Sequence, residues 1–214
     1  MRLAVAATPE VAIPTLEFLL SGTDPLVKVF TTEDKPVGRG RALTPTVVAS
    51  WASIHGVECI KIGKASEMSA HLDDIDCVVT VAFGILLPQE ILSIPTHGFI
   101  NLHFSLLPAW RGAAPVQRAI ENGDEELGIS VFSLDEGMDT GPIYAIRELK
   151  ISESATTDSL LTELSVLGSA AVLTAIDSIL SNIAPVKQIL AGSIAPKISK
   201  ADAAINWSLT KQEV

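Results

Sequence analysis

An almost unbroken apolar run at residues 76–82, Asp-Cys-Val-Val-Thr-Val-Ala, constrains the fold more than any other segment. A strand with one face in water alternates polar and apolar residues, whereas a strand covered on both faces of a parallel sheet is apolar almost throughout. The run is therefore predicted to be a buried strand of a parallel sheet.

Strand and helix patterns alternate along the rest of the chain. Further strands are predicted at residues 3–7, 26–31, 57–60, 98–103, 128–134 and 143–150. Helices are predicted at residues 9–20, 44–56, 88–92, 114–122 and 157–182. Thr8-Pro9 and Thr44-Pro45 suit helix starts, and Gly123 suits a helix end. This order predicts an α/β fold, a Rossmann-like open and mostly parallel sheet with helices on both faces.

The composition limits the classes of partner. The 214 residues are 48% apolar and carry a formal charge of −10, so the surface as a whole should not attract nucleic acid. Any such contact must rest on a local basic patch, for which Lys35, Arg39 and Arg41 in a polar loop at 32–43 are the candidates. No run approaches the roughly 18 apolar residues of a membrane span. Cys59 and Cys77 show no pairing motif, as expected of reduced thiols in a cytoplasmic protein.

Polar side chains that suit acyl transfer follow two of the predicted strands. Asn101 and His103 lie two residues apart at the end of one strand, so both side chains lie on one face at the edge where such sheets bind ligands. An amide can donate to a developing oxyanion, and an imidazole can hold or move a proton. Asp139 lies between Gly137 and Gly141, in a tight loop that would present its carboxylate at a fixed point. Taken singly, such residues are more often loop anchors and turn formers.

Four motifs occur together in one order: Asn101-x-His103-x-Ser105-Leu106-Leu107-Pro108, Arg111-Gly112-x-x-Pro115, Gly128 and Asp139-Thr140-Gly141. The combination resembles the folate-dependent formyltransferases. Segments at 8–10, 30–40 and 197–207 look like the methionyl-tRNA formyltransferases within that superfamily, and the resemblance extends from residue 1 to about residue 210.

The resemblance implies a reaction and roles for three residues. A formyl group would pass from 10-formyltetrahydrofolate to the amino group of methionine on initiator tRNA. Asn101 would stabilise the oxyanion with help from His103, while Asp139 would orient His103 and manage the amine proton, either directly or through water. No metal ion is required by this scheme.

The resemblance also implies two binding regions. The folate would contact two segments, Ser105, Leu106, Leu107 and Pro108 together with Phe83, Gly84, Ile85 and Leu86. The alternative for residues 83–88 is a plain strand-to-helix connection. The 32–43 loop would meet the tRNA acceptor end through Arg39, with Lys35 and Arg41 beside it; without the resemblance it is only a solvated loop.

The sequence departs from the family in two places. Ala7 stands where the family usually has glycine, and a left-handed backbone would be strained there. The family continues into a linker and a C-terminal β-barrel, so we expect residues 1–183 to form the catalytic domain and residues 184–214 to be a tail or linker towards an absent domain. A truncated chain of this kind should bind tRNA weakly.

Two other functions stay open. A related formyltransferase could act on a small-molecule acceptor such as glycinamide ribonucleotide or an amino sugar nucleotide, or the chain could be a folate-binding module without efficient transfer. The 35–41 and 197–207 segments favour initiator Met-tRNA as the partner, and the set Asn101, His103 and Asp139 favours catalysis. The expected protein is a cytoplasmic monomer that does not bind membranes.

Overall fold

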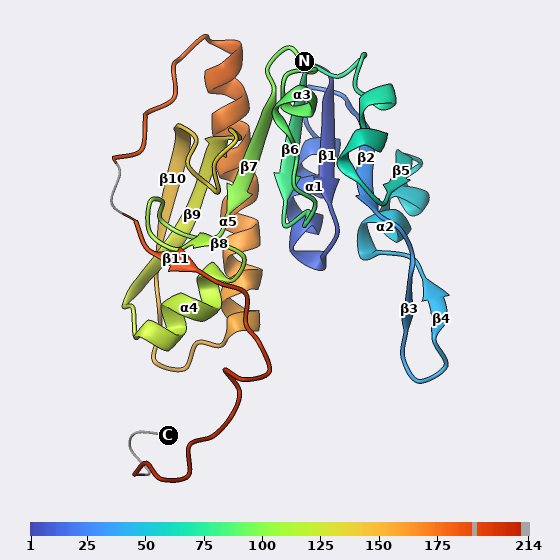
Figure 1. Ribbon diagram of the computed structural model, residues 1–214. Helices are drawn as coiled ribbons and strands as arrows, with labels where there is room; N and C mark the ends of the chain where they lie inside the picture. The colour runs from blue at the N-terminus through green and yellow to red at the C-terminus, as the bar shows by residue number, and fades with distance from the viewer. Residues whose placement is uncertain (190–191, 211–214) are drawn as a thin grey trace.

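A seven-stranded sheet forms the centre of the protein, in the strand order β10-β9-β7-β6-β1-β2-β5 (Figure 1). The fold is taken from a computed structural model that describes residues 1–189 and 192–210. The strands of the sheet are β1 (Leu3–Ala7), β2 (Leu26–Thr32), β5 (Glu58–Ile62), β6 (Cys77–Val81), β7 (Phe99–His103), β9 (Glu126–Ser133) and β10 (Ile143–Lys150).

Strands β5, β2, β1, β6 and β7 are parallel, and β9 and β10 are antiparallel additions at one edge. The chain builds from β1 outward to β2 and β5, and then places β6 on the other side of β1. This reversal creates a switch point at the carboxyl ends of β1 and β6, where open α/β sheets bind ligands. All five residues of β6 are buried, as the apolar run predicts, and the mostly parallel Rossmann-like sheet is confirmed.

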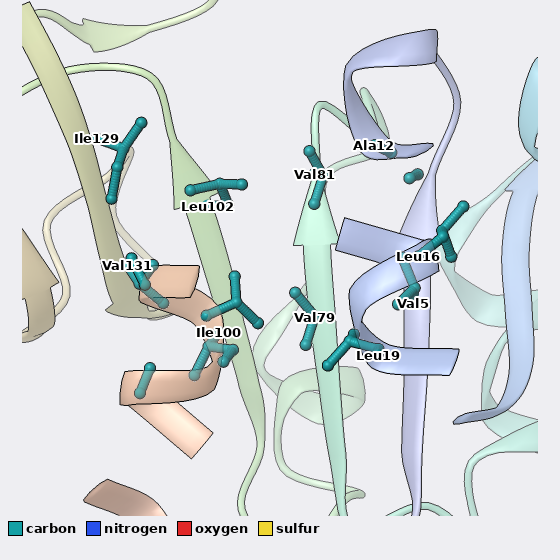
Figure 2. Close-up of a cluster of buried hydrophobic side chains, with 14 of the residues drawn as sticks. Val5, Ala12, Leu16, Leu19, Val79, Val81, Ile100, Leu102, Ile129 and Val131 are labelled. Atoms are coloured by element: carbon teal, nitrogen blue, oxygen red, sulfur yellow. The ribbon is translucent and has the colours of Figure 1, made fainter. Parts of the chain in front are cut away.

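Helices cover both faces of the sheet, because successive side chains of each strand point to opposite sides. Val5, Val79 and Ile100 belong to a core shared with α1 (Ile13–Leu20), α2 (Val47–His55), α4 (Pro115–Asn122) and α5 (Thr157–Leu180). Figure 2 shows part of this core between the sheet and α1 and α5. A second core on the other side packs β6 and β7 against α3 (Gln89–Leu92) and the segment of the 3-10 helices Ala65–Glu67 and Ser69–His71.

Helix α5 differs from the expectation that no segment is long and apolar enough to cross a membrane. Within the described ranges it is the helix long and apolar enough to cross a membrane by length and composition, although half of the relevant window is buried. In the fold it packs along β9, β10 and α1. Its buried residues recur every three or four positions, as in Leu160, Leu164, Ala171 and Ala175, which is the pattern of a core helix.

The first two helices begin later than the threonine–proline pairs predict. A 3-10 turn at Glu10–Ala12 precedes α1, because Pro14 lacks the N–H that a continuous α-helical ladder would need. For α2 the cap is Thr46 instead of Thr44, and its Oγ1 accepts a hydrogen bond of 3.0 Å from the Ala49 amide. Thr44 instead ends a short strand.

The predicted loop at 32–43 contains a hairpin, which corrects the sequence analysis. Strand β3 (Lys35–Val37) pairs antiparallel with β4 (Ala42–Thr44). The turn closes because Gly38 and Arg41 take left-handed backbone conformations, with φ of 71° and 48°. Both strands are fully exposed, so they lack the alternating apolar pattern that identifies a strand in sequence.

Ala7 also differs from expectation. It is a buried, extended residue at the end of β1, and it is not among the described residues with positive φ. The left-handed position near the switch point is taken by Ala82 instead, with φ of 45°. The strain expected at Ala7 is therefore absent.

The tail after α5 turns back onto the domain. Val186 bridges Ile143 on β10, and β11 (Ile194–Ala195) pairs parallel with β8 (Arg111–Gly112). Ala195 is fully buried. At least this part of the region predicted as a tail packs against the loop that follows β7.

Candidate active site

A cavity of about 480 Å³ opens at the carboxyl ends of β6 and β7. Asn101 and His103 line it from β7, and Asp139 lines it from the loop between β9 and β10. The structure therefore brings together the three polar residues that the sequence singles out, although they lie on different elements.

Asn101 is oriented by its neighbour on β6. Thr80 and Asn101 are register partners, and the Thr80 hydroxyl donates a hydrogen bond of 2.7 Å to Asn101 Oδ1. Thr80 is only 3% exposed, so water does not compete for this contact. Because a hydroxyl hydrogen occupies Oδ1, the amide nitrogen is the end of the side chain left free to donate into the cavity.

His103 is held by a hydrogen bond at Nε2, the ring nitrogen on the side away from Asp139. Nε2 lies 2.9 Å from the carbonyl oxygen of Trp110, which can only accept, so Nε2 carries a hydrogen. Nδ1 is then the nitrogen that gains or loses a proton, and it lies 3.7 Å from Asp139 Oδ2. The ring is nearly buried and meets Phe132 edge-on.

Asp139 is fixed by its backbone and by one hydrogen bond. Its φ is 54°, a left-handed value that is uncommon outside glycine. Oδ2 accepts a hydrogen bond of 2.7 Å from the Gly112 amide. Oδ1 makes no hydrogen bond within the described residues, so it can accept one from a ligand.

These three groups supply the functions that acyl transfer needs. The cavity offers a neutral donor at Asn101 Nδ2, a proton-exchanging nitrogen at His103 Nδ1 and a carboxylate at Asp139. Apart from Thr80 and the exposed carboxylates Asp135 and Glu136, the other lining side chains are apolar, which strengthens the electrostatic effect of these groups relative to water.

The predicted folate segment after β6 also lines this cavity. Phe83, Gly84, Ile85 and Leu86 all contribute to its wall. Gly84 has a φ of 79°, and Leu86 is 93% exposed at the rim. The left-handed conformations of Ala82 and Gly84 shape the strand-to-helix connection at this point.

The other predicted folate segment lies elsewhere. Ser105 is fully buried and donates a hydrogen bond to the Ala109 carbonyl, so its hydroxyl does not face the cavity. Leu107 and Pro108 line a separate groove of about 400 Å³ beside β10. Leu106 packs over Gly128, where a Cβ would collide with it, which gives a structural reason for the glycine. None of Ser105, Leu106, Leu107 and Pro108 lines the cavity with Asn101.

The basic residues lie away from the cavity wall. Lys35, Arg39 and Arg41 are all exposed on the β3–β4 hairpin. Figure 1 shows this hairpin extending beyond the carboxyl ends of the strands, the end of the sheet where the cavity lies.

Three contacts that hold the polar residues of the cavity were not predicted from the sequence. Thr80, Trp110 and Gly112 each hold one of the three polar residues. Thr80 is the one hydroxyl within the apolar run of β6, a signal that could have been noticed. The Trp110 carbonyl and the Gly112 amide are backbone groups, so a pattern of side chains does not predict these contacts.

Comparison with known protein families gives a match to the formyl transferase family over residues 1–176. A methionyl-tRNA formyltransferase from Salinispora tropica is 44% identical over 214 residues, covering 97% of this chain and 69% of that protein. The methionyl-tRNA formyltransferase of Corynebacterium efficiens is 40% identical and covers all of this chain and 71% of its own length.

Solved structures share the fold. An N-formyltransferase from Helicobacter canadensis, in complex with folinic acid and dTDP-3-aminofucose, aligns with a TM-score of 0.75 and 21% identity, over 99% of this chain and 77% of that one. The phosphoribosylglycinamide formyltransferase of Bacillus halodurans aligns with a TM-score of 0.71 and 22% identity, over 86% and 97% of the two chains.

Proposed function

Because this chain belongs to the formyl transferase family, in its methionyl-tRNA formyltransferase branch, we propose that it transfers a formyl group from 10-formyltetrahydrofolate to the amino group of methionyl initiator tRNA. The observation that carries the proposal is the meeting of Asn101, His103 and Asp139 in one cavity of a chain 44% identical to such an enzyme.

The cavity suits the folate donor. Its volume of about 480 Å³ is within the range of small-molecule sites. Phe83 and Ile85 offer apolar surface for a flat heterocycle, and the connection after β6 offers backbone groups to its polar edge. The folate when bound supplies an activated formyl group. Folate binding by the Ser105–Pro108 segment receives no support from the cavity lining, so we propose the 83–86 segment as the folate contact.

The polar residues suit the steps of transfer. As the acceptor amine adds to the formyl carbon, charge develops on the formyl oxygen, and Asn101 Nδ2 is free to donate a hydrogen bond to it. A protonated His103 adds positive charge on the same side, with Asp139 as its counter-ion. Asp139 Oδ1 accepts the amine proton, directly or through water, and a proton is returned to the folate nitrogen when the carbon–nitrogen bond of the donor breaks.

The acceptor is proposed from the relatives and the hairpin. Arg39, with Lys35 and Arg41, presents positive charge on an exposed loop at the cavity end of the sheet, and guanidinium groups pair well with phosphate. The role implies a cytoplasmic protein that works as a monomer on initiator Met-tRNA without a membrane.

A comparison of acceptors tests the proposal. The purified chain is given 10-formyltetrahydrofolate labelled in the formyl group and, in separate reactions, methionyl initiator tRNA, phosphoribosylglycinamide or a dTDP-amino sugar. Label should appear on the tRNA and be absent with Asn101→Ala. Label on a small-molecule acceptor alone would identify a different formyltransferase, and folate binding without label on any acceptor would identify a binding module.

A further inference from the structure

Asp139 of the His103–Asp139 pair and Trp110, which contacts His103, have left-handed backbones that non-glycine residues rarely adopt. Trp110, whose carbonyl holds His103 Nε2, has a φ of 58°, and Asp139 has a φ of 54°. Each such conformation is strained and persists only when the surroundings enforce it. The groups that enforce these two conformations therefore decide where the pair lies.

The two ends of the Gln188 amide bond to two different segments, the Asp139 loop and Arg111 on β8. Nε2 donates hydrogen bonds of 2.9 Å to the Asp139 carbonyl and 2.7 Å to the Gly141 carbonyl. Oε1 accepts hydrogen bonds from Arg111 Nη2 at 2.6 Å and from Nε at 3.3 Å. Gln188 thus links the backbone of Asp139 to the strand that contains Gly112, whose amide holds the Asp139 carboxylate.

Ser193 holds the other residue. Its Oγ accepts a hydrogen bond of 2.9 Å from the Trp110 amide, and its carbonyl accepts one of 2.9 Å from the Arg111 amide. Ala195 continues the attachment, because its carbonyl accepts from the Ala113 and Ala114 amides. At Gly112, with φ of 121°, a Cβ would lie 2.7 Å from that same carbonyl, so the two segments are in close contact.

We propose that the described part of residues 186–196, here called the strap, positions the His103–Asp139 pair, with Gln188 and Ser193 as positioning residues. The inference rests on the proposed function, since it concerns the same reaction. Gln188 and Ser193 do not line the cavity, and the strap lies outside residues 1–176 that match the family. Although residues 184–214 are predicted as a tail, the strap acts as part of the catalytic unit.

The chemistry of Gln188 makes the inference specific. A glutamate in its place keeps the length and the acceptor for Arg111, but it has no hydrogen to donate and brings an anion against two carbonyl oxygens. Gln188→Glu should therefore release Asp139 as fully as Gln188→Ala does. If the residue only tied the strap to Arg111, Glu would serve as well as Gln.

The experiment measures kcat, KM for 10-formyltetrahydrofolate and the unfolding midpoint for the full chain. Gln188→Ala and Gln188→Glu should each lower kcat by roughly 10–100-fold, because misplacement by about 1 Å has effects of that size. The KM should stay within about threefold, since no described residue of the strap lines the cavity proposed to bind folate. Lys187→Ala, an exposed neighbour on the same segment, is the matched control and should keep the wild-type kcat.

Ser193 provides an independent variant if the Gln188 changes impair folding. Ser193→Ala should lower kcat, and Ser193→Thr, which keeps the hydroxyl at an exposed position, should restore it. A wild-type kcat in folded Gln188→Glu and Ser193→Ala would overturn the inference, as would equal losses in Ser193→Ala and Ser193→Thr. Transfer activity in the wild-type chain separates these results from failure of the proposed function, which would leave every variant and the wild type inactive.

Discussion

His103 Nδ1 lies 3.7 Å from Asp139 Oδ2, which is longer than a hydrogen bond and short enough for an ion pair when the ring is protonated. The separation arises because Asp139 Oδ2 is already bonded to the Gly112 amide and His103 Nε2 to the Trp110 carbonyl. Each side chain is thus held by one hydrogen bond to the backbone, at His103 Nε2 and at Asp139 Oδ2. His103 Nδ1 and Asp139 Oδ1 remain available to a ligand in the cavity.

Asp139→Asn separates the charge of this carboxylate from its shape. The amide oxygen can still accept from the Gly112 amide, so the loop should keep its place. The variant loses the counter-ion of His103 and the proton acceptor for the amine. We expect kcat to fall by roughly 100-fold or more with the unfolding midpoint unchanged. Steady-state kinetics and thermal unfolding of the same preparation check this, and an unaltered kcat would remove Asp139 from the mechanism.

Thr80→Val tests whether the Asn101 amide needs its orientation fixed. Valine has almost the shape of threonine, but it cannot donate to Asn101 Oδ1. Leaving that partly buried oxygen without its donor costs up to about 1–3 kcal/mol, and the amide can rotate to reduce the cost. We expect kcat to fall about tenfold while folate binding is retained.

The control for this change is Thr15→Val, at another fully buried threonine, whose Oγ1 has no hydrogen-bond partner within the described residues. That variant should keep the wild-type kcat. Equal kcat values for Thr80→Val and the wild type would show that Asn101 is oriented by other contacts.

Leu164→Ala tests the packing of α5 against the sheet. Leu164 is fully buried, whereas Val166 on the same helix is 60% exposed. Removing the buried side chain should lower the free energy of unfolding by about 2–5 kcal/mol. Val166→Ala should lower it by less than about 0.5 kcal/mol, as is usual at the surface. Urea unfolding of both variants measures the difference, and similar values would contradict the assignment of α5 as a core helix.

Asp74→Asn should change how the free energy of unfolding depends on pH in the acidic range. Hydrogen bonds from Lys28 and Arg2 lower the pKa of the Asp74 carboxyl from 3.8 to about 2. A pKa lowered by folding gives stability that is complete above the unfolded value and disappears as the pH falls through the folded value. The wild type should therefore lose its advantage over Asp74→Asn between about pH 4 and pH 2.

Urea midpoints of the two proteins across that interval provide the measurement. Asp73→Asn is the neighbouring control, because Asp73 makes no ion pair within the described residues. Its midpoint should follow that of the wild type. A constant gap between the wild type and Asp74→Asn at every pH would contradict the ionic origin of the contact.

The sheet could be predicted because its signal is local. The apolar run of β6 and the spacing of β1, β7, β9 and β10 each identify a strand without knowledge of its partners. The convergence of Asn101 and His103 follows from the same logic, since residues two apart at a strand end share a face. Helix starts were less accurate because Pro14 lacks a backbone donor inside the first predicted helix, and because Thr46, two residues after Thr44, caps α2 with its side chain.

The strap and the Ser105 segment could not be predicted for a different reason. The attachment of Gln188 and Ser193 uses backbone carbonyls and amides of distant loops, and any polar residue in an irregular segment could make such bonds. Ser105 is part of a sequence motif, but its burial depends on the turn that brings the Ala109 carbonyl within hydrogen-bond distance of its hydroxyl. Motifs therefore pointed to the three polar residues of the cavity better than to the residues that hold them.

The most direct test of the account is the single-turnover rate of formyl transfer to methionyl initiator tRNA by Asn101→Asp, with the chain saturated by 10-formyltetrahydrofolate. Aspartate keeps the side-chain shape and the contact with Thr80, but it replaces the amide donor with a negative charge where the oxyanion forms. We predict a rate at least about 100-fold below that of the wild type, with folate still bound. A rate within about twofold of the wild type would contradict the assignment of this cavity as the site of transfer.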